Sequence, residues 1–198
     1  MKKFFVLIAV AIVSMSAMAQ VQFGAKVGVD MTNFWGKDAE HGMKPSYQAG
    51  LVMEYKFNPH FAIAPEVVFA SQGGKFDAVE FDWGDISVAS KKKITFNTNY
   101  INVPLMLKYY VAPEFSVDFG PQVGFNVYSK ATIKDDLTYD LKDSTKAVDF
   151  GLGLGGTYNL TDNAFVQARY TLGLTKVFEG DFNKEKNGNI QLAFGMKF

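Results

Sequence analysis

The residues that could do chemistry in this 198-residue chain are few and far apart. It contains two histidines, His41 and His60, and no cysteine that could act as a nucleophile or bind a metal. His41 falls in a long predicted connection and His60 in a tight turn at the opposite end of the predicted sheet, so they cannot share a site. Since a hydrolytic dyad needs a base and a nucleophile within hydrogen-bond reach, we expect no catalytic residues, no metal site, no cofactor and no enzyme activity.

Two further patterns resemble binding motifs without their structural context. Gly151, Gly153 and Gly156 match the spacing of a dinucleotide-binding loop, but such a loop needs a helix behind it, and "TYNLTDN" reads as a strand end and a turn. The acids Asp135, Asp136, Asp140 and Asp143 could gather around calcium, yet they lack the ligand spacing of a dedicated loop. A solvated surface loop is the favoured interpretation, with calcium left open.

The elements that would position these residues are β-strands, because apolar residues recur at every second position through most of the chain. In "SYQAGLVMEYKF", for example, the odd-numbered residues from Tyr47 to Phe57 are apolar. This alternation predicts eight strands: 22–33, 46–57, 61–72, 98–111, 115–128, 147–159, 164–174 and 188–198. Three prolines, Pro65, Pro104 and Pro121, fall inside these strands, where we expect local bulges.

Connections of two lengths alternate along the chain. Three are short and rich in turn formers, at 58–60, 112–114 and 161–163, whereas those at 34–45, 73–97, 129–146 and 175–187 are long. Short turns therefore lie at one end of the sheet and long loops at the other, as in an outer-membrane barrel. The pattern predicts an all-β fold, an eight-stranded antiparallel up-and-down transmembrane β-barrel with both termini at the short-turn end.

The chemistry of the two strand faces favours a membrane barrel over a soluble one. The polar face combines ten glycines with five basic and five acidic residues, a mixture suited to a narrow interior where every ion finds a partner. The apolar face carries no lysine or arginine in the strand cores, as a lipid-facing surface requires. The predicted lumen ion network comprises Lys26, Asp30, Glu54, Lys56, Glu66, Lys108, Asp118, Asp149, Arg169 and Lys197.

The N-terminal residues predict export. Lys2 and Lys3 precede a short apolar run and Ala17-Met18-Ala19 fits a cleavage site, so we expect a signal peptide at 1–19, cut before Gln20, and a barrel domain at 20–198. The apolar run is about half of what a spanning helix needs. The predicted mature chain carries 18 basic and 20 acidic side chains, which gives no electrostatic reason to expect nucleic acid as a partner.

The C-terminal "NIQLAFGMKF" alternates up to its aromatic last residue. A barrel needs its last strand to pair with its first, since no open edge survives in hydrocarbon. The pattern resembles the signal that barrel-assembly machineries recognise, and Phe194, Met196 and Phe198 would form it. Other aromatics expected near the same end would form an interfacial girdle: Phe23, Tyr55, Phe57, Phe61, Tyr109, Phe115 and Tyr158.

Three segments carry a family resemblance. "YINVPLMLKYY" at 100–110, "DFGPQVGF" at 118–125 and the hairpin at 149–174 resemble strands of PorT-type outer-membrane β-barrel proteins. The resemblance covers essentially the whole mature chain and implies a barrel similar to those of OmpX and OmpA, in the envelope of a Gram-negative cell. It implies little about activity, although the family's namesake takes part in protein secretion.

Function is expected to reside in the exposed loops. We expect an integral outer-membrane protein with a filled polar lumen, acting in surface interaction, adhesion or envelope integrity; an accessory subunit of a secretion machine and a soluble lipocalin-like carrier are the alternatives. Expected partners are outer-membrane lipids and lipopolysaccharide, the barrel-assembly machinery, and a surface or envelope protein. In the longest loop the flanking segments "KFDAVEF" and "ITFNTNY" alternate too, so we expect a hairpin that protrudes beyond the bilayer. This hairpin is the candidate interaction edge, with the residues Phe76, Phe81, Trp83, Lys91, Lys92 and Lys93.

Overall fold

The computed structural model describes residues 20–35, 41–79, 91–133, 137–140, 145–177 and 186–198. The predicted signal peptide at 1–19 lies outside the described residues. So do two of the candidate loop residues, Phe81 and Trp83, and three of the loop acids, Asp135, Asp136 and Asp143. Asp140, the fourth acid, lies at the end of a short strand.

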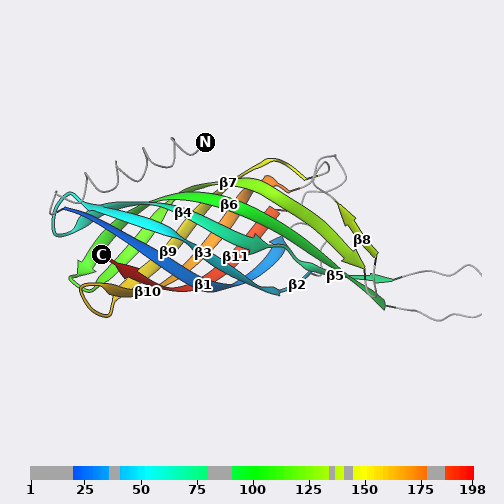
Figure 1. Cartoon of the computed structure of the whole chain (residues 1–198), viewed down its shortest axis with the longest axis horizontal. Helices are drawn as coiled ribbons and strands as arrows, with labels where there is room; N and C mark the ends of the chain where they lie inside the picture. The colour runs from blue at the N-terminus through cyan, green and yellow to red at the C-terminus, as the bar shows by residue number, and fades with distance from the viewer. Residues whose placement is uncertain (1–19, 36–40, 80–90, 134–136, 141–144, 178–185) are drawn as a thin grey trace, which may run out of the picture.

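Eight long strands form the wall of a closed antiparallel barrel (Figure 1). Their order around the wall is β6-β4-β3-β1-β11-β10-β9-β7, and pairing of β6 with β7 closes the cylinder. The described residues contain no helix long and apolar enough to cross a membrane. The strands are β1 (Val21–Trp35), β3 (Lys44–Lys56), β4 (Phe61–Gln72), β6 (Lys91–Ala112), β7 (Phe115–Ile133), β9 (Val148–Asn159), β10 (Ala164–Lys176) and β11 (Lys186–Lys197).

The last strand pairs with the first along its whole length, as the alternating C-terminal sequence predicted. The register runs from Gly24 opposite Lys197 to Trp35 opposite Lys186. Beyond it, the N–H of Phe198 donates to the carbonyl of Phe23 at 2.8 Å. Closure removes the open sheet edges whose unpaired N–H and C=O groups lipid could not satisfy. The predicted eight-stranded barrel is confirmed.

Side chains of the turn residues shape the short connections. In the β3–β4 turn, Asn58 Oδ1 accepts hydrogen bonds from the N–H groups of His60 and Phe61, both at 2.9 Å. In the β9–β10 turn, Thr161 Oγ1 does the same for the N–H groups of Asn163 and Ala164. Such short polar side chains replace the missing backbone partners of a tight turn. All three tight turns lie at the end where β1 begins and β11 ends (Figure 1).

The long-loop end contains more strand than the sequence predicted. Three additional short strands join the sheet there: β2 (His41–Gly42), β5 (Lys75–Val79) and β8 (Leu137–Asp140). β2 pairs with β5, β5 with β6, and β8 with β7. The intervals 34–45, 73–97 and 129–146 are therefore not wholly loop, and β6 and β7 extend beyond the barrel as part of this protruding sheet (Figure 1).

The predicted bulges at the three prolines were wrong. Pro65, Pro104 and Pro121 keep the register of the residues around them, opposite Leu105, Gln122 and Leu152. Proline removes one ladder hydrogen bond but adds no residue, so it need not shift the register. Register shifts occur elsewhere, notably beside Tyr100 on β6.

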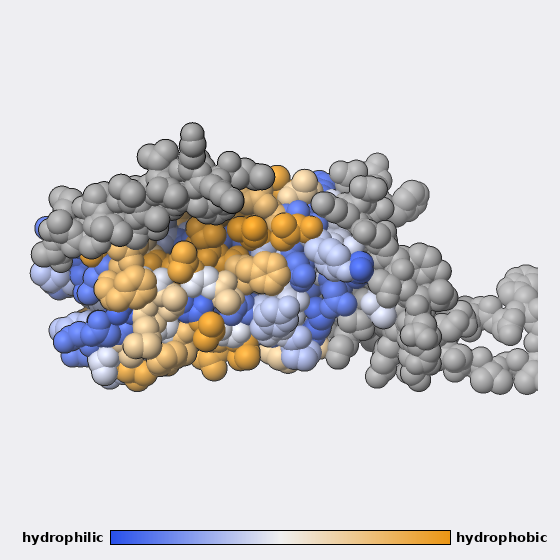
Figure 2. All heavy atoms as spheres, viewed as in Figure 1, coloured by the Kyte–Doolittle hydropathy of each residue, from blue (hydrophilic) through white to orange (hydrophobic). Residues whose placement is uncertain are grey.

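The two faces of the wall have the predicted orientation. Charged and polar residues of every wall strand are buried inside the barrel, whereas the large apolar residues of the alternate positions are exposed on its outer surface. Figure 2 shows hydrophobic residues over the middle of the barrel and hydrophilic residues toward both ends. A soluble carrier would have the opposite arrangement, an apolar cavity inside a polar shell. The wall is therefore built to face lipid.

Candidate functional site

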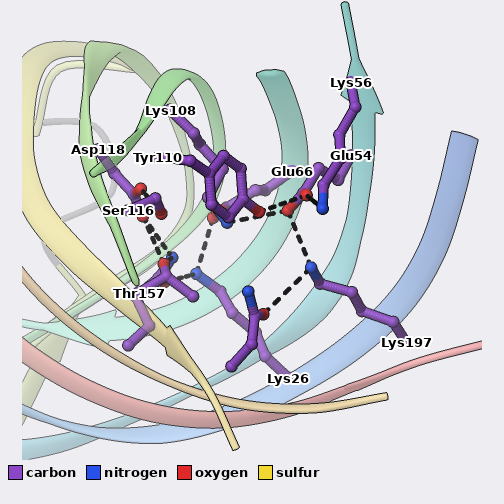
Figure 3. A network of polar contacts seen from close by, with 12 residues as sticks. Lys26, Glu54, Lys56, Glu66, Lys108, Tyr110, Ser116, Asp118, Thr157 and Lys197 are labelled. Atoms are coloured by element: carbon purple, nitrogen blue, oxygen red, sulfur yellow. Dashed lines mark hydrogen bonds and ion pairs between the residues drawn. The ribbon is translucent and has the colours of Figure 1, made fainter. Parts of the chain in front are cut away.

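The middle of the barrel interior is occupied by a buried ion cluster, called here the central cluster: Lys26, Glu66 and Arg169 (the labelled members Lys26 and Glu66 are shown in Figure 3). Glu66 accepts a 2.7 Å bond from Lys26 Nζ and two bonds from the Arg169 guanidinium, at 2.9 and 2.7 Å. All three side chains are at most 2% exposed. Such short bidentate contacts are the strongest form of ion pair.

Asp118 extends the central cluster through neutral side chains. Its carboxylate accepts hydrogen bonds from the hydroxyls of Ser116 and Thr157 and from the amide of Gln167. Gln167 in turn accepts a 2.8 Å bond from Lys26 Nζ. Two acids and two bases therefore form one connected and electrically neutral network.

A second group, called here the mouth cluster, lies toward the short-turn end and surrounds Glu54 (Figure 3). Lys108 Nζ and Lys197 Nζ each donate to Glu54 Oε2, at 2.9 and 3.0 Å. Lys56 Nζ lies 4.0 Å from Oε1, and Tyr110 donates its hydroxyl to the same oxygen. Lys108 and Lys197 are buried, but the Lys56 side chain is 40% exposed.

The two remaining acids of the predicted network lie apart from both clusters. Asp30 Oδ1 accepts a 2.8 Å bond from Gln48, and Asp149 Oδ2 accepts a 2.9 Å bond from Asn187. The other oxygen of each carboxylate is buried without a hydrogen-bond partner among the described residues. All ten predicted ions thus lie on the inner face, eight of them in the central cluster with Asp118 and the mouth cluster, and Asp30 and Asp149 each apart.

Glycines make room for the long ionic side chains. A Cβ atom on Gly153 would lie 3.4 Å from Arg169 Cδ and 3.3 Å from Met106 Cε. A Cβ atom on Gly195 would clash with the edge of the Phe165 ring, at Cζ and both Cε atoms. At these positions the backbone itself packs against the lumen side chains.

Sequence reasoning missed the neutral members of the network. Gln167, Tyr110, Ser116 and Thr157 bind the ions but carry no charge to mark them. Alternation could have assigned them to the inner face, because Gln167 lies two residues before Arg169 and Tyr110 lies two residues after Lys108. Lys44 was also missed: it is 8% exposed, and its Nζ donates to the carbonyl of Gln72 at 3.2 Å.

The predicted residues outside the lumen lie at the two ends of the barrel. Phe194, Met196 and Phe198 point outward from the last strand and are 45%, 55% and 79% exposed. At the long-loop end, Phe76 pairs with His41 and Ile94, and Lys91 to Lys93 pair with Val79 to Asp77. The hydrophilic ends in Figure 2 lie on either side of the hydrophobic band.

The motifs with possible chemistry do not come together. His60 is exposed in the β3–β4 turn, and His41 lies in β2 at the opposite end. Gly151, Gly153 and Gly156 all lie within strand β9, where no helix follows. Within the described parts of the chain, no three His, Asp or Glu side chains are grouped as metal ligands would be.

The lipid-facing wall and ionic interior agree with the comparison to known families. The model of the outer membrane protein beta-barrel domain matches residues 15–179, most of the chain. This chain belongs to that family. As a member of it, the protein is an outer-membrane barrel, and its localisation is the outer membrane. No curated protein matches the chain significantly.

Solved barrels share the fold at low sequence identity. Ail, the attachment invasion locus protein of Yersinia pestis, is 15% identical with a TM-score of 0.52; the match covers 90% of this chain and 99% of Ail. Neisserial surface protein A is 14% identical with a TM-score of 0.55, over 89% of this chain and 97% of that protein. Ail has also been solved with the heparin analogue sucrose octasulfate, and that structure gives 15% identity and a TM-score of 0.51, covering 90% of this chain and 99% of that one.

Proposed function

We propose that this barrel works through its exposed loop end in surface interaction, adhesion or envelope integrity, and has no enzymatic activity. The observation that carries the proposal is the protruding sheet, in which β2, β5 and β8 extend β6 and β7 beyond the wall at that end only (Figure 1). Extended strands with open edges offer backbone groups to a partner. Its fold likeness to a protein of attachment and invasion supports the same role.

The longest loop is the proposed contact region. Its aromatic residues Phe76, Phe81 and Trp83 and its basic run Lys91, Lys92 and Lys93 suit a polyanionic partner, such as lipopolysaccharide or a sulfated glycan. The complex of Ail with a heparin analogue supports this choice of probe.

Deletion of residues 79–92 tests the loop proposal. Because the wall strands pair independently of this segment, the variant should still form a barrel that migrates faster on an SDS gel without boiling. Retention of the barrel, in nanodiscs, on immobilised heparin should fall strongly. Because the deletion removes Lys91 and Lys92, a matched change of Lys176 and Lys186 to Gln controls for the loss of two lysines at the same end. Equal retention of the deletion variant and the parent would refute the loop's role.

A lumen filled by side chains, without an open pore, is the second part of the proposal. It is supported by the burial of the central cluster and by the connected bonds to Asp118. An eight-stranded barrel is just wide enough for its own side chains. Planar bilayers containing the purified barrel should show no steady conductance, and a reproducible ohmic conductance would contradict the filled lumen.

A role as an accessory subunit of a protein-secretion machine is the alternative. Its support is the resemblance of 100–110 and 118–125 to PorT-type strands. Co-purification of the tagged barrel from mild detergent with large envelope proteins would favour it over the adhesion proposal. The soluble carrier is not proposed further, because the wall carries its apolar face outward.

Export and assembly complete the proposal. A signal peptide at 1–19 would be removed before Gln20, which mass measurement of the mature N-terminus tests directly. The barrel-assembly machinery would recognise Phe194, Met196 and Phe198 on the last strand. The non-enzymatic role is tested by His41→Ala, which should leave the acylation pattern of lipid A unchanged; loss of a deacylase or acyltransferase activity would overturn it.

A further inference from the structure

The short-turn end of the barrel opens into a polar cavity. Its volume is about 450 Å³, within the range typical of small-ligand sites. Gln22, Lys56, Asn159 and Lys197 line it from the strands, and Glu114 and Asp162 from the turns. Since short turns and both termini mark the periplasmic end of such barrels, the cavity faces the periplasm, away from the loops discussed above.

The mouth cluster, which contributes Lys56 and Lys197 to the lining of this cavity, carries more positive than negative charge. The mouth cluster places Lys56, Lys108 and Lys197 around the single carboxylate of Glu54 (Figure 3). Because Lys108 and Lys197 donate to the same oxygen, their ammonium nitrogens lie no more than about 6 Å apart and repel each other. The central cluster together with Asp118, by contrast, has as many acids as bases. The mouth cluster therefore has two positive charges in excess.

The acids on the rim do not offset this excess. Glu114 and Asp162 are exposed on the turns, and within the described residues neither forms an ion pair with Lys56 or Lys197. Exposed charges on a rim are strongly screened by water and salt, whereas the buried ammoniums of Lys108 and Lys197 are screened little. The field of the mouth cluster is thus directed into the cavity.

Hydrogen-bonding groups lie beside the excess charge. Lys197 Nζ already donates to Asn159 Oδ1 at 3.3 Å, so the amide group of Asn159 lies at the cavity wall beside the ammonium. Gln22 supplies a second amide, and the 40% exposed Lys56 can turn its ammonium toward a ligand. A carboxylate or phosphate can accept hydrogen bonds from ammonium and amide groups together. The cavity offers both kinds of donor side by side.

We infer that the periplasmic mouth binds a small anionic group, a carboxylate or phosphate, between Lys56 and Lys197, with Gln22 and Asn159 as hydrogen-bond donors. The bound anion supplies the negative charge that Glu54 alone does not. Two sources present this chemistry at the mouth: the headgroup of a phospholipid of the inner leaflet, and a solute of the periplasm.

The binding is tested on the whole mature barrel in phosphatidylcholine nanodiscs. Acetate and inorganic phosphate are titrated while amide NMR signals are followed, with choline chloride at matched ionic strength as the cation control. Saturable shifts are expected at 159–162 and at Glu114. Lys56→Met should weaken binding about tenfold, the effect of losing one charge-assisted bond. Lys130→Met, at the other end of the barrel, should leave affinity unchanged.

The direction in which a second substitution changes the affinity for the anion distinguishes a binding role from a structural one. Glu54→Gln removes the one carboxylate that competes for the three ammoniums and should tighten anion binding, which a loosened fold would not do. Of the two substitutions, Lys56→Met should disturb the fold less, because the contact of Lys56 with Glu54 is the longest in the mouth cluster, at 4.0 Å. If Glu54→Gln fails to fold, the comparison of Lys56→Met with Lys130→Met decides.

Phosphatidylglycerol nanodiscs distinguish the two sources. If a lipid headgroup occupies the mouth, the apparent affinity for acetate falls several-fold in these discs; if the ligand is a solute, the affinity is the same in both. Both results support an anion site. Shifts that do not saturate, equal shifts with choline, or equal effects of the Lys56 and Lys130 variants would overturn it.

Discussion

Replacement of Glu66 by Gln should destabilise the barrel strongly. Glutamine keeps the size of the side chain and one acceptor oxygen, but it removes the charge that both Lys26 and Arg169 contact at 2.7–2.9 Å. Both cations would stay in a site where the side chains are at most 2% exposed. Breaking a buried pair in this way costs about 3–5 kcal/mol, most of it from the uncompensated charge.

The magnitude is large enough to measure by urea titration in lipid vesicles. With a slope of about 1–3 kcal/mol per molar urea, a loss of about 3 kcal/mol moves the midpoint of unfolding by roughly 1–3 M. The fraction that migrates as folded barrel on an unboiled SDS gel should report the same midpoint. Glu114→Gln, an exposed acid in the β6–β7 turn, is the matched control and should shift the midpoint very little.

Replacing Lys26, Glu66 and Arg169 together by Met, with Asp118→Asn so that no buried charge of the network remains, separates charge from packing. If uncompensated charge causes the loss, this variant should recover much of the stability that Glu66→Gln loses, since buried ion clusters are often replaceable by apolar residues. The reasoning would be refuted if Glu66→Gln and Glu114→Gln unfolded at the same urea concentration.

Three further predictions concern residues of the barrel wall. Gly195→Ala should cost about 1–3 kcal/mol, measured by the same titration, because its Cβ would overlap the ring of Phe165. Leu192→Lys on the lipid-facing surface should cost about 2–4 kcal/mol at mid-depth, whereas Leu160→Lys in a turn should cost little; equal costs would contradict the membrane orientation. Phe198→Ala should lower the yield of assembled barrel in cells while leaving the stability of the purified, folded protein nearly unchanged; a large loss of stability would instead indicate a structural role.

Much of the wall could be predicted because strand geometry is local. Successive side chains point to opposite faces. The odd-numbered Leu51 and Val67 are therefore assigned to the outer face, and the even-numbered Glu54 and Glu66 to the inner face. Both leucine and valine proved more than half exposed to the lipid side, while both acids are buried. Turn residues such as Asn58 also act locally, which is why the tight turns were predictable.

Odd and even numbering no longer predicts the face of a residue beyond a β-bulge. Beside Tyr100 the β6–β7 register shifts by one residue, so Val127 and Tyr128 are consecutive and both exposed, 42% and 39%. Beyond them Ser129, which was predicted to begin a loop, is fully buried, although it has the same odd numbering as the exposed apolar residues before the bulge. One extra residue reverses the face of everything that follows, and nothing in the local sequence marks its position.

The protruding hairpin of β5 and β6 was predicted from its alternation, but β2 and β8 were missed for a different reason. A strand of two residues such as β2 exists only because β5 lies beside it, and so short a segment carries no periodicity.

The sequence determined by itself that the protein is a lipid-facing barrel, because alternation, turn spacing and face chemistry are properties of neighbouring residues. Only the tertiary structure decided which ions meet. Glu66 and Arg169 are 103 residues apart in the chain and Glu66 and Lys26 are 40 apart, yet they form one cluster. Parity gives the face of a residue but not its height or its angle around the cylinder. These are fixed by the stagger of all eight strands, which exists only when the barrel closes.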